Sequence, residues 1–307
     1  MTNKLIVSSS PHIHTPDTTS GIMLDVIVAL LPAAAFSIVL FGWRAALIIT
    51  VCIVFSVLFE VLACKLFGHD VTVRDLSAVV TGLLLALNLP PSIAGKNIWM
   101  AVVGCFVAIF IVKQMFGGLG HNFVNPAIAA RIVLLVSFPA QMTSYYAPFS
   151  NAVTEATPLA NPDINLSVKE LLFGTYGGSI GETSVLLLII GGLYLIIRGI
   201  IKPIIPVTFI GSVALLTLIL GGDPVFAVCS GGVVLGAVFM ATDYVTSPTT
   251  DLGKAIFGLG CGIITVIIRS GAAVEGVSYA ILFMNLLVPH IDRITVRKPF
   301  GWEAPAK

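Results

Sequence analysis

Long apolar stretches separated by short polar segments run through most of this sequence. An α-helix needs about 20 apolar residues to cross a bilayer at 1.5 Å rise per residue. Ten stretches approach that length, and several are short or interrupted by glycine and proline; they lie at residues 21–42, 44–66, 74–90, 97–115, 122–138, 183–200, 203–221, 224–242, 254–270 and 275–290. The pattern predicts an all-α polytopic membrane protein with about ten transmembrane helices.

Polar segments divide the chain into five parts. Residues 1–20 are rich in Ser, Thr and Pro and lack the apolar run of a signal peptide, so we expect an exposed amino-terminal segment. Ser20 is a candidate N-cap for the first helix. The remaining parts are a first transmembrane repeat at 21–138, a polar loop at 139–182, a second repeat at 183–290 and a tail at 291–307.

Composition agrees with a membrane protein. The chain is 57% apolar and 10% charged, whereas soluble domains carry about 25% charged residues. This excludes an ordinary soluble domain and makes the lipid bilayer the expected surroundings. The formal net charge of +1 gives no sign of a nucleic-acid partner.

Lysine and arginine are distributed unequally between the two sides of the predicted spans. With a cytoplasmic amino terminus, four of the 16 basic residues fall outside (Arg44, Lys96, Lys169 and Arg269). Eleven fall inside: Lys4, Lys65, Arg74, Lys113, Arg198, Lys202, Lys254, Arg293, Arg297, Lys298 and Lys307. Because cytoplasmic segments carry the excess of positive charge, we expect both termini inside and the loop 139–182 outside.

The two halves of the chain contain a weak repeat. Residues 80–96 resemble 234–254, and Gly104-Cys105 pairs with Gly260-Cys261. Five spans per half is an odd number, so the halves must have opposite orientations in the membrane. Inverted repeats with interrupted helices are a recurrent transporter architecture. We therefore predict two inverted five-helix repeats.

Three interruptions carry polar residues into the apolar pattern. They are Asn88-Leu-Pro-Pro91, Asp243-Tyr-Val-Thr-Ser-Pro248 and Gly117-Gly-Leu-Gly-His-Asn-Phe-Val-Asn-Pro126. Proline breaks a helix, and freed backbone at membrane depth is tolerated only in protein or beside a cavity. Together they indicate a central site for a polar ligand or an ion; the alternative is ordinary capping at helix ends.

Four ionisable residues fall inside or beside the predicted spans. Such residues are costly in a membrane and are commonly functional. Asp243 is the best placed, in a broken helix, and Asp25 is a candidate for an ion path. Glu60 and Arg131 form a candidate structural pair.

Known metal and enzyme signatures are absent from the sequence. The five cysteines, which include the repeat-related Cys105 and Cys261, are scattered singly through apolar stretches without a CxxC motif. Zinc and iron–sulfur sites need clustered thiolates, so we interpret these residues as packing residues and expect no metal site and no catalytic residue.

The polar loop contains Asn151-Ala-Val-Thr-Glu-Ala-Thr-Pro158. Proline biases the preceding Thr157 towards an extended conformation, which would hold its hydroxyl away from the backbone. The spacing alone is compatible with either a simple turn or a modification site.

This segment resembles the flavinylation motif Asp-x-x-(Ser/Thr)-x-Ala-Thr of the RnfD and NqrB membrane subunits. Thr154 matches the first hydroxyl position, Ala156 the alanine and Thr157 the acceptor, while Asn151 stands where the family usually has Asp. Three further segments, at residues 10–14, 120–127 and 239–243, also look like family segments, so the resemblance covers nearly the full chain. The length of 307 residues is closer to that of RnfD.

The resemblance implies a redox function. In that family a flavin transferase that uses FAD joins FMN to the acceptor threonine, here Thr157, through a phosphoester. Relatives also hold a second, non-covalent flavin, riboflavin, near the interrupted helices; Asn122, Asn125 and Asp243 match the segments implicated there. The family fold is ten spans in two inverted halves, similar to the urea and ammonium channels.

The resemblance also implies a place in a larger assembly. The chain would be a membrane subunit of an Rnf-type ferredoxin:NAD⁺ oxidoreductase in the bacterial inner membrane, where Na⁺ or H⁺ is moved. Its partners would be flavin- and iron–sulfur-bearing subunits. Two other classes stay open. A small-solute channel or secondary transporter would need no flavin, and a purely structural membrane subunit would not depend on Thr157 for electron flow.

Overall fold

Helices make up nearly all of the regular structure in this computed structural model, which describes residues 18–68, 72–149, 153–154, 167–182, 184–271 and 275–296. In the first part of the chain the main helices are α1 (Thr19–Phe41), α2 (Trp43–Phe67), α3 (Ser77–Leu87), α4 (Trp99–Cys105), its π-helical continuation η3 (Phe106–Gln114), and α5 (Pro126–Ser137). Short elements connect them: η1 (Val73–Asp75), η2 (Pro91–Ile93) and α6 (Pro139–Met142).

The second part also contains both long and short helices. Its elements are α7 (Val168–Phe173), η4 (Ile180–Glu182), α8 (Val185–Ile197), α9 (Ile204–Ile219), α10 (Pro224–Cys229), α11 (Val233–Leu235), the π-helix η5 (Gly236–Met240), α12 (Asp251–Ser270) and α13 (Gly276–Thr295). Between the two parts, strands β1 (Tyr145–Tyr146) and β2 (Val153–Thr154) form an antiparallel pair, with Tyr145 opposite Thr154.

Helical segments occupy all ten predicted stretches, but the eighth is not one helix. Residues 224–242 form α10, α11 and η5 instead. The break falls at Gly231 and Gly232, whose φ angles of +64° and +68° lie in the left-handed region that glycine adopts without strain. Among the described residues, three helices (α1, α2 and α12) are long and apolar enough to cross a membrane. Five more apolar helices are shorter, as in a polytopic membrane protein.

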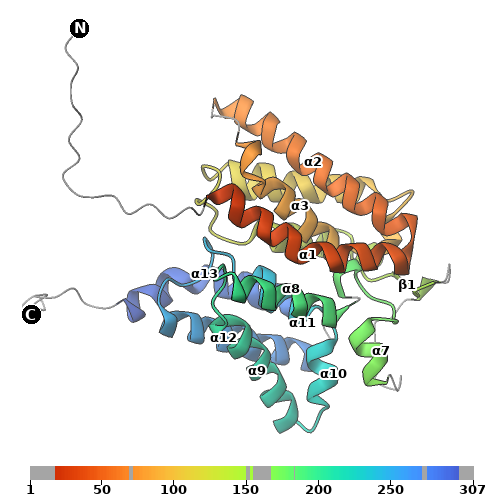
Figure 1. Ribbon diagram of the computed structural model, residues 1–307, viewed down its shortest axis with the longest axis vertical. Helices are drawn as coiled ribbons and strands as arrows, with labels where there is room; N and C mark the ends of the chain where they lie inside the picture. The colour runs from red at the N-terminus through yellow and green to blue at the C-terminus, as the bar shows by residue number, and fades with distance from the viewer. Residues whose placement is uncertain are drawn as a thin grey trace, which may run out of the picture.

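The helices form two groups that lie against each other (Figure 1). The first group contains α1 to α5 and the second contains α8 to α13. Helix α1 packs against α8 across the boundary, and α5 packs against α13. Most side chains of the interrupted elements α3, α5, α11 and η5 are buried in this arrangement.

Large apolar side chains cover the outer surfaces of the long helices. On α1 and α2 they include Leu31, Val39, Leu58 and Leu66, each at least half exposed. Helix α9 exposes Val207, Leu215, Leu218 and Ile219 in the same way. Soluble monomers rarely expose contiguous apolar patches of this extent, so these surfaces suit contact with lipid.

Side chains at the interruptions satisfy the backbone groups that the breaks set free. Asn88 ends α3, and its Nδ2 donates to the carbonyl of Leu84 at 2.7 Å. Asn125 begins α5, and its Oδ1 accepts from the amides of Ala127 and Ile128 at 3.0 and 3.3 Å. The predicted capping role is thus present at these two asparagines, and both are also buried between the groups of helices.

Candidate functional site

A cavity of about 300 Å³ lies between the two groups of helices. Its apolar wall comes from α1, α3 and η5 and includes Ile22, Val80, Leu84 and Phe239. Its polar wall contains Ser77, Thr81, Lys113, Asn122, Asn125, Thr242 and Asp243. An apolar pocket with a few convergent polar groups is the usual form of a cofactor or ligand site.

Three residues singled out from the sequence meet at this cavity. Asn122, Asn125 and Asp243 all line it, although they come from two different interruptions. The Asn122 amide interacts with the carboxyl of Asp243, and Thr246 Oγ1 donates to Asp243 Oδ2 at 3.0 Å. Asn125 Nδ2 donates to the carbonyl of Met240, at the end of η5, at 3.1 Å. Two of the three predicted interruptions therefore contribute residues to one cavity, whereas Asn88 does not line it.

The lining combines hydrogen-bonding groups with apolar side chains. Amide groups offer both donors and acceptors, and the carboxyl of Asp243 is an acceptor when ionised. The apolar side chains in the same lining include Leu84 and Phe239. Both π-helices, η3 and η5, contribute residues to the lining, and π-helical turns occur often at functional sites.

A buried ion pair stands at one end of the cavity. Lys113 Nζ lies 2.6 Å from Glu60 Oε1, with the two side chains 3% and 0% exposed. Lys113 also donates to Ser77 Oγ at 2.6 Å, and Gln114 donates to Glu60 at 3.2 Å. The predicted pairing of Glu60 with Arg131 is therefore wrong, because the π-helix η3 brings Lys113 to Glu60 instead.

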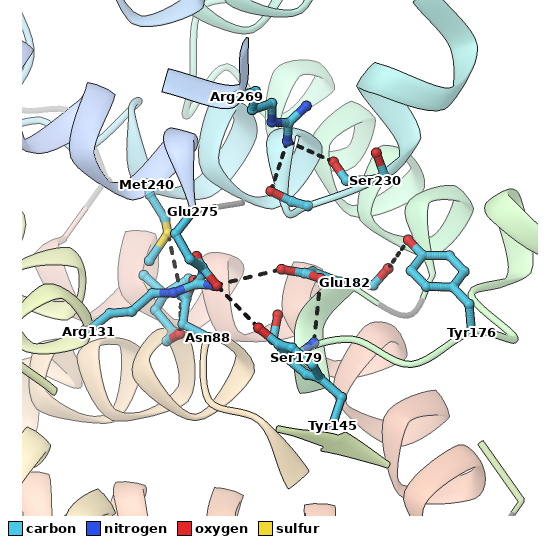
Figure 2. Close-up of polar contacts among 12 residues, drawn as sticks. Asn88, Arg131, Tyr145, Tyr176, Ser179, Glu182, Ser230, Met240, Arg269 and Glu275 are labelled. Carbon is cyan, nitrogen blue, oxygen red and sulfur yellow. Dashed lines mark hydrogen bonds and ion pairs between the residues drawn. The ribbon is translucent and has the colours of Figure 1, made fainter. Parts of the chain in front are cut away.

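Arg131 lies at the centre of a second buried cluster (Figure 2). Its guanidinium donates to Asn88 Oδ1 at 2.5 Å and forms ion pairs with Glu275 and, at 3.7 Å, with Glu182. The Tyr145 hydroxyl donates to Glu275 at 3.3 Å. Burial, together with Glu275, raises the pKa of the Tyr145 phenol, so this hydroxyl stays protonated and able to donate.

Sequence reasoning missed the acidic members of this cluster. Glu182 belongs to η4 and Glu275 precedes α13, so both lie at the borders of apolar stretches, where a solvated residue is expected. Asn88 lies in a predicted interruption, but nothing in the sequence predicts its contact with Arg131. The three partners come from both halves of the chain.

The candidate ion-path residue Asp25 lies on α1 against α8. Its carboxylate accepts from the Tyr194 hydroxyl at 2.7 Å and from Arg198 at 3.0 Å. Asp25 is not part of the cavity lining, whereas Asp243 is. The two acidic candidates are therefore at different places in the fold.

The cysteines are all free and buried, in agreement with a packing role. Cys105 Sγ donates to the carbonyl of Cys52 at 3.4 Å, and Cys261 is likewise enclosed by helices. Within the described ranges, no group of three or more His, Cys, Asp or Glu side chains could hold a metal ion.

The motif of the polar loop is only partly described. Thr157 and Ala156 lie outside the described residues, as does Asn151. Thr154 belongs to β2 and is the backbone partner of Tyr145. On the neighbouring residue of β1, the ring of Tyr146 lies 4.0 Å from the guanidinium carbon of Arg44. The strand that leads to Thr157 is thus paired with a strand that contacts both Arg44 and the Arg131 cluster.

Comparison with known proteins gives consistent matches over almost the whole chain. The profile described as "NQR2, RnfD, RnfE family" matches residues 6–301. The D subunit of the Na⁺-translocating ferredoxin:NAD⁺ oxidoreductase complex of Acetobacterium woodii is 49% identical, covering 97% of this chain and 95% of that protein. The proton-translocating counterpart of Clostridium ljungdahlii is 43% identical, covering 97% of both chains. The D subunit of an ion-translocating oxidoreductase complex of Stutzerimonas stutzeri is 37% identical over 93% of both.

Proposed function

Because this chain belongs to the NQR2, RnfD, RnfE family, we propose that it is the RnfD-type membrane subunit of an ion-translocating oxidoreductase. In this role it relays electrons between redox partners while Na⁺ or H⁺ is moved across the membrane. We expect other subunits to oxidise ferredoxin and reduce NAD⁺, because this sequence has no nucleotide-binding motif and no Cys-rich cluster motif. The similarity to D subunits of such complexes along nearly the full chain is the observation that carries this proposal.

The proposed covalent cofactor is FMN, joined to Thr157 by a phosphoester. Thr154 and Ala156 complete the acceptor motif, and a flavin transferase is the partner that makes the bond. The pairing of β2 with β1 supports this assignment, because it restrains the chain only three residues before the acceptor. A tethered flavin can accept and donate electrons without being lost from an exposed loop.

The cavity is the proposed site of the second, non-covalent flavin, of the riboflavin type. Asn122, Asn125 and Asp243 would hold the polar edge of its ring system, and Phe239 and Leu84 would cover its faces. The side-chain chemistry supports this proposal, because the lining combines amide and carboxyl groups with apolar side chains.

The proposed topology follows the charge distribution of the sequence. Ten membrane segments in two inverted halves would place both termini in the cytoplasm of a bacterial cell and the acceptor loop on the opposite side of the inner membrane. The excess of Lys and Arg on the side assigned to the cytoplasm supports this orientation. Flavin- and iron–sulfur-bearing subunits of the complex would then approach from both sides.

Detection of the bound flavin tests the proposed function. The chain is expressed together with its flavin transferase, denatured fully, separated on a gel and examined for flavin fluorescence. Peptide mass spectrometry then locates the adduct. FMN on the peptide that contains Thr157 is the expected result. An unmodified peptide from a host that supplies active transferase would contradict it and favour a small-solute transporter.

Substitution of Asp243 should weaken binding of the non-covalent flavin. A hydrogen bond to a charged group contributes about 1.5–3 kcal/mol, so Asp243→Asn is expected to lower flavin affinity roughly tenfold or more. The measurement is the ratio of acid-extractable to covalently bound flavin in the purified complex. Asp223→Asn is the matched control, because Asp223 caps α10 and does not line the cavity. An unchanged ratio in Asp243→Asn would remove this residue from the flavin site.

Asp25 and Asp243 are the proposed candidates for an ion path. Asp25→Asn removes the charge that pairs with Arg198 and is expected to raise the apparent Km for the transported ion, with flavin content unchanged. Loss of a charge-assisted contact worth about 1.5–3 kcal/mol corresponds to roughly tenfold or more. The check is ion uptake per electron in vesicles at several ion concentrations. Asp251→Asn, on an exposed ion pair with Lys202, is the control. Equal Km values in both variants would exclude Asp25 from the path.

A further inference from the structure

The guanidinium of Arg131 lies where interrupted helices from both halves of the chain meet. Asn88, which accepts from Arg131, is the C-cap residue directly after the interrupted helix α3. The Asn88 amide in turn donates to the sulfur of Met240, at the end of η5, at 3.4 Å. The Asn88 amide therefore connects the end of α3 in the first group of helices with the end of η5 in the second group, and it also binds Arg131.

Arg131 lies further along α5 than the residues of that helix that line the cavity. Asn125, at the cavity wall, precedes Arg131 by six residues on α5, which corresponds to about 9 Å of helix rise. Beyond Arg131 lie Glu275, whose side chain is 13% exposed, and Tyr145. Contacts through Met240 and Asn88 thus connect Asn125 at the cavity with Arg131 and, beyond it, with the partly exposed Glu275.

The oxygen atoms around Arg131 would attract a small cation if the guanidinium were absent. Asn88 Oδ1, Glu182 and Glu275 all face one position from three different segments of the chain (Figure 2). Carboxylate and amide oxygens are the groups that coordinate hard cations in proteins. The guanidinium occupies that position, with its side chain only 6% exposed.

An arginine is well suited to exclude cations from such a place. It stays charged under all conditions that a protein meets. Fixed positive charge at a narrow point is a known means of keeping cations and protons out of membrane pores, and charges repel strongly where water is scarce. The Nε atom of Arg131 is buried without a hydrogen-bond partner. The polar contacts of the guanidinium with Asn88, Glu182 and Glu275 are made by its two terminal nitrogens.

We propose that Arg131 is an electrostatic seal, which keeps small cations from passing between the cavity and the Tyr145–Glu275 end of the bundle. The guanidinium fills an oxygen-lined position that would otherwise conduct or bind monovalent cations. Ions moved by the complex then cannot return along the axis where the broken helices meet. This role concerns passive leakage, so it does not depend on which flavins the chain carries.

Passive ion flux through the purified complex tests the seal. The complex is reconstituted into vesicles without electron donor or acceptor, and the decay of an imposed Na⁺ or H⁺ gradient is followed with an ion-sensitive dye. Arg131→Gln is expected to speed this decay at least tenfold, whereas Arg131→Lys, which keeps a cation, should stay within twofold of the unmodified complex. Arg269→Gln is the matched control. Arg269 is also an internal arginine, but it donates to the carbonyls of Ala227, Ser230 and Gly231 and not to the oxygens around Arg131.

A second variant covers the case in which Arg131→Gln fails to assemble because it leaves two buried carboxylates unpaired. The double substitution Arg131→Gln with Glu275→Gln removes the cation together with one of these charges, and it should also leak. An assembled Arg131→Gln or double variant with the unmodified rate of gradient decay would overturn the proposal. Failure of both to assemble, while Arg269→Gln assembles normally, would also overturn it, because the role of Arg131 would then be structural.

Discussion

Replacement of Thr157 by alanine should abolish electron transfer through the complex while leaving the complex assembled. The substitution removes the hydroxyl that accepts the FMN phosphoester, so no covalent flavin can form at this position. Since the residue belongs to a polar loop, the helix bundle should not depend on it. The measurements are flavin fluorescence of the denatured subunit, ferredoxin-dependent reduction of NAD⁺, and subunit content by native gel.

Thr157→Ser is the matched variant, because serine keeps the hydroxyl and loses only a methyl group. It should retain covalent flavin and a substantial part of the electron transfer. Normal turnover in Thr157→Ala would contradict the proposed relay and would favour a subunit that only anchors its redox partners. Loss of turnover together with loss of assembly would instead assign Thr157 to folding or docking.

Replacement of Glu60 by alanine should strongly destabilise the membrane part of the chain. It leaves Lys113 buried at 3% exposure without its carboxylate partner. Breaking a buried ion pair by removing one member costs about 3–5 kcal/mol, which is a large fraction of typical protein stability of about 5–15 kcal/mol. The expected result is a strongly lowered melting temperature in detergent and little assembled complex.

The double variant Glu60→Ala with Lys113→Met separates this effect from simple loss of packing. Removal of both charges leaves no unpaired ion from this pair in the interior, and such neutral replacements are often tolerated. The double variant should therefore recover most of the thermal stability that Glu60→Ala loses. If it were as unstable as the single variant, the pair would not account for the effect, and the contacts of Glu60 with Gln114 and Thr72 would have to do so.

The helices and the central polar residues were predictable because their signals are local. Proline, glycine and asparagine in an apolar run mark a helix break wherever the rest of the chain lies. Asn122, Asn125 and Asp243 stand out on this basis, and the fold brings all three to one cavity. The prediction of the eighth span as one helix was less accurate, because Gly231 and Gly232 allow a turn that the apolar pattern alone does not reveal.

The ion pairs were not predictable because their partners are distant in the sequence. Glu60 and Arg131 are both charged residues in apolar stretches, and nothing local distinguishes which basic group will face which acid. The π-helical turn of η3 adds a residue per turn and so alters the direction of Lys113. Glu182 and Glu275 lie at segment borders, where an exposed position is the ordinary expectation. The inverted relation of the two halves stays a prediction from the repeat at 80–96 and 234–254.

The contact between Tyr145 and Glu275 has a consequence for the order of events during biosynthesis. Tyr145 lies in the acceptor loop, on the strand that pairs with Thr154, and is synthesised when about half of the chain has been made. Glu275 directly precedes α13, the last described helix, and is synthesised much later. The hydrogen bond between Tyr145 and Glu275 can therefore form only when insertion of the polypeptide is nearly complete. A chain that is only half inserted would present the acceptor loop without this contact.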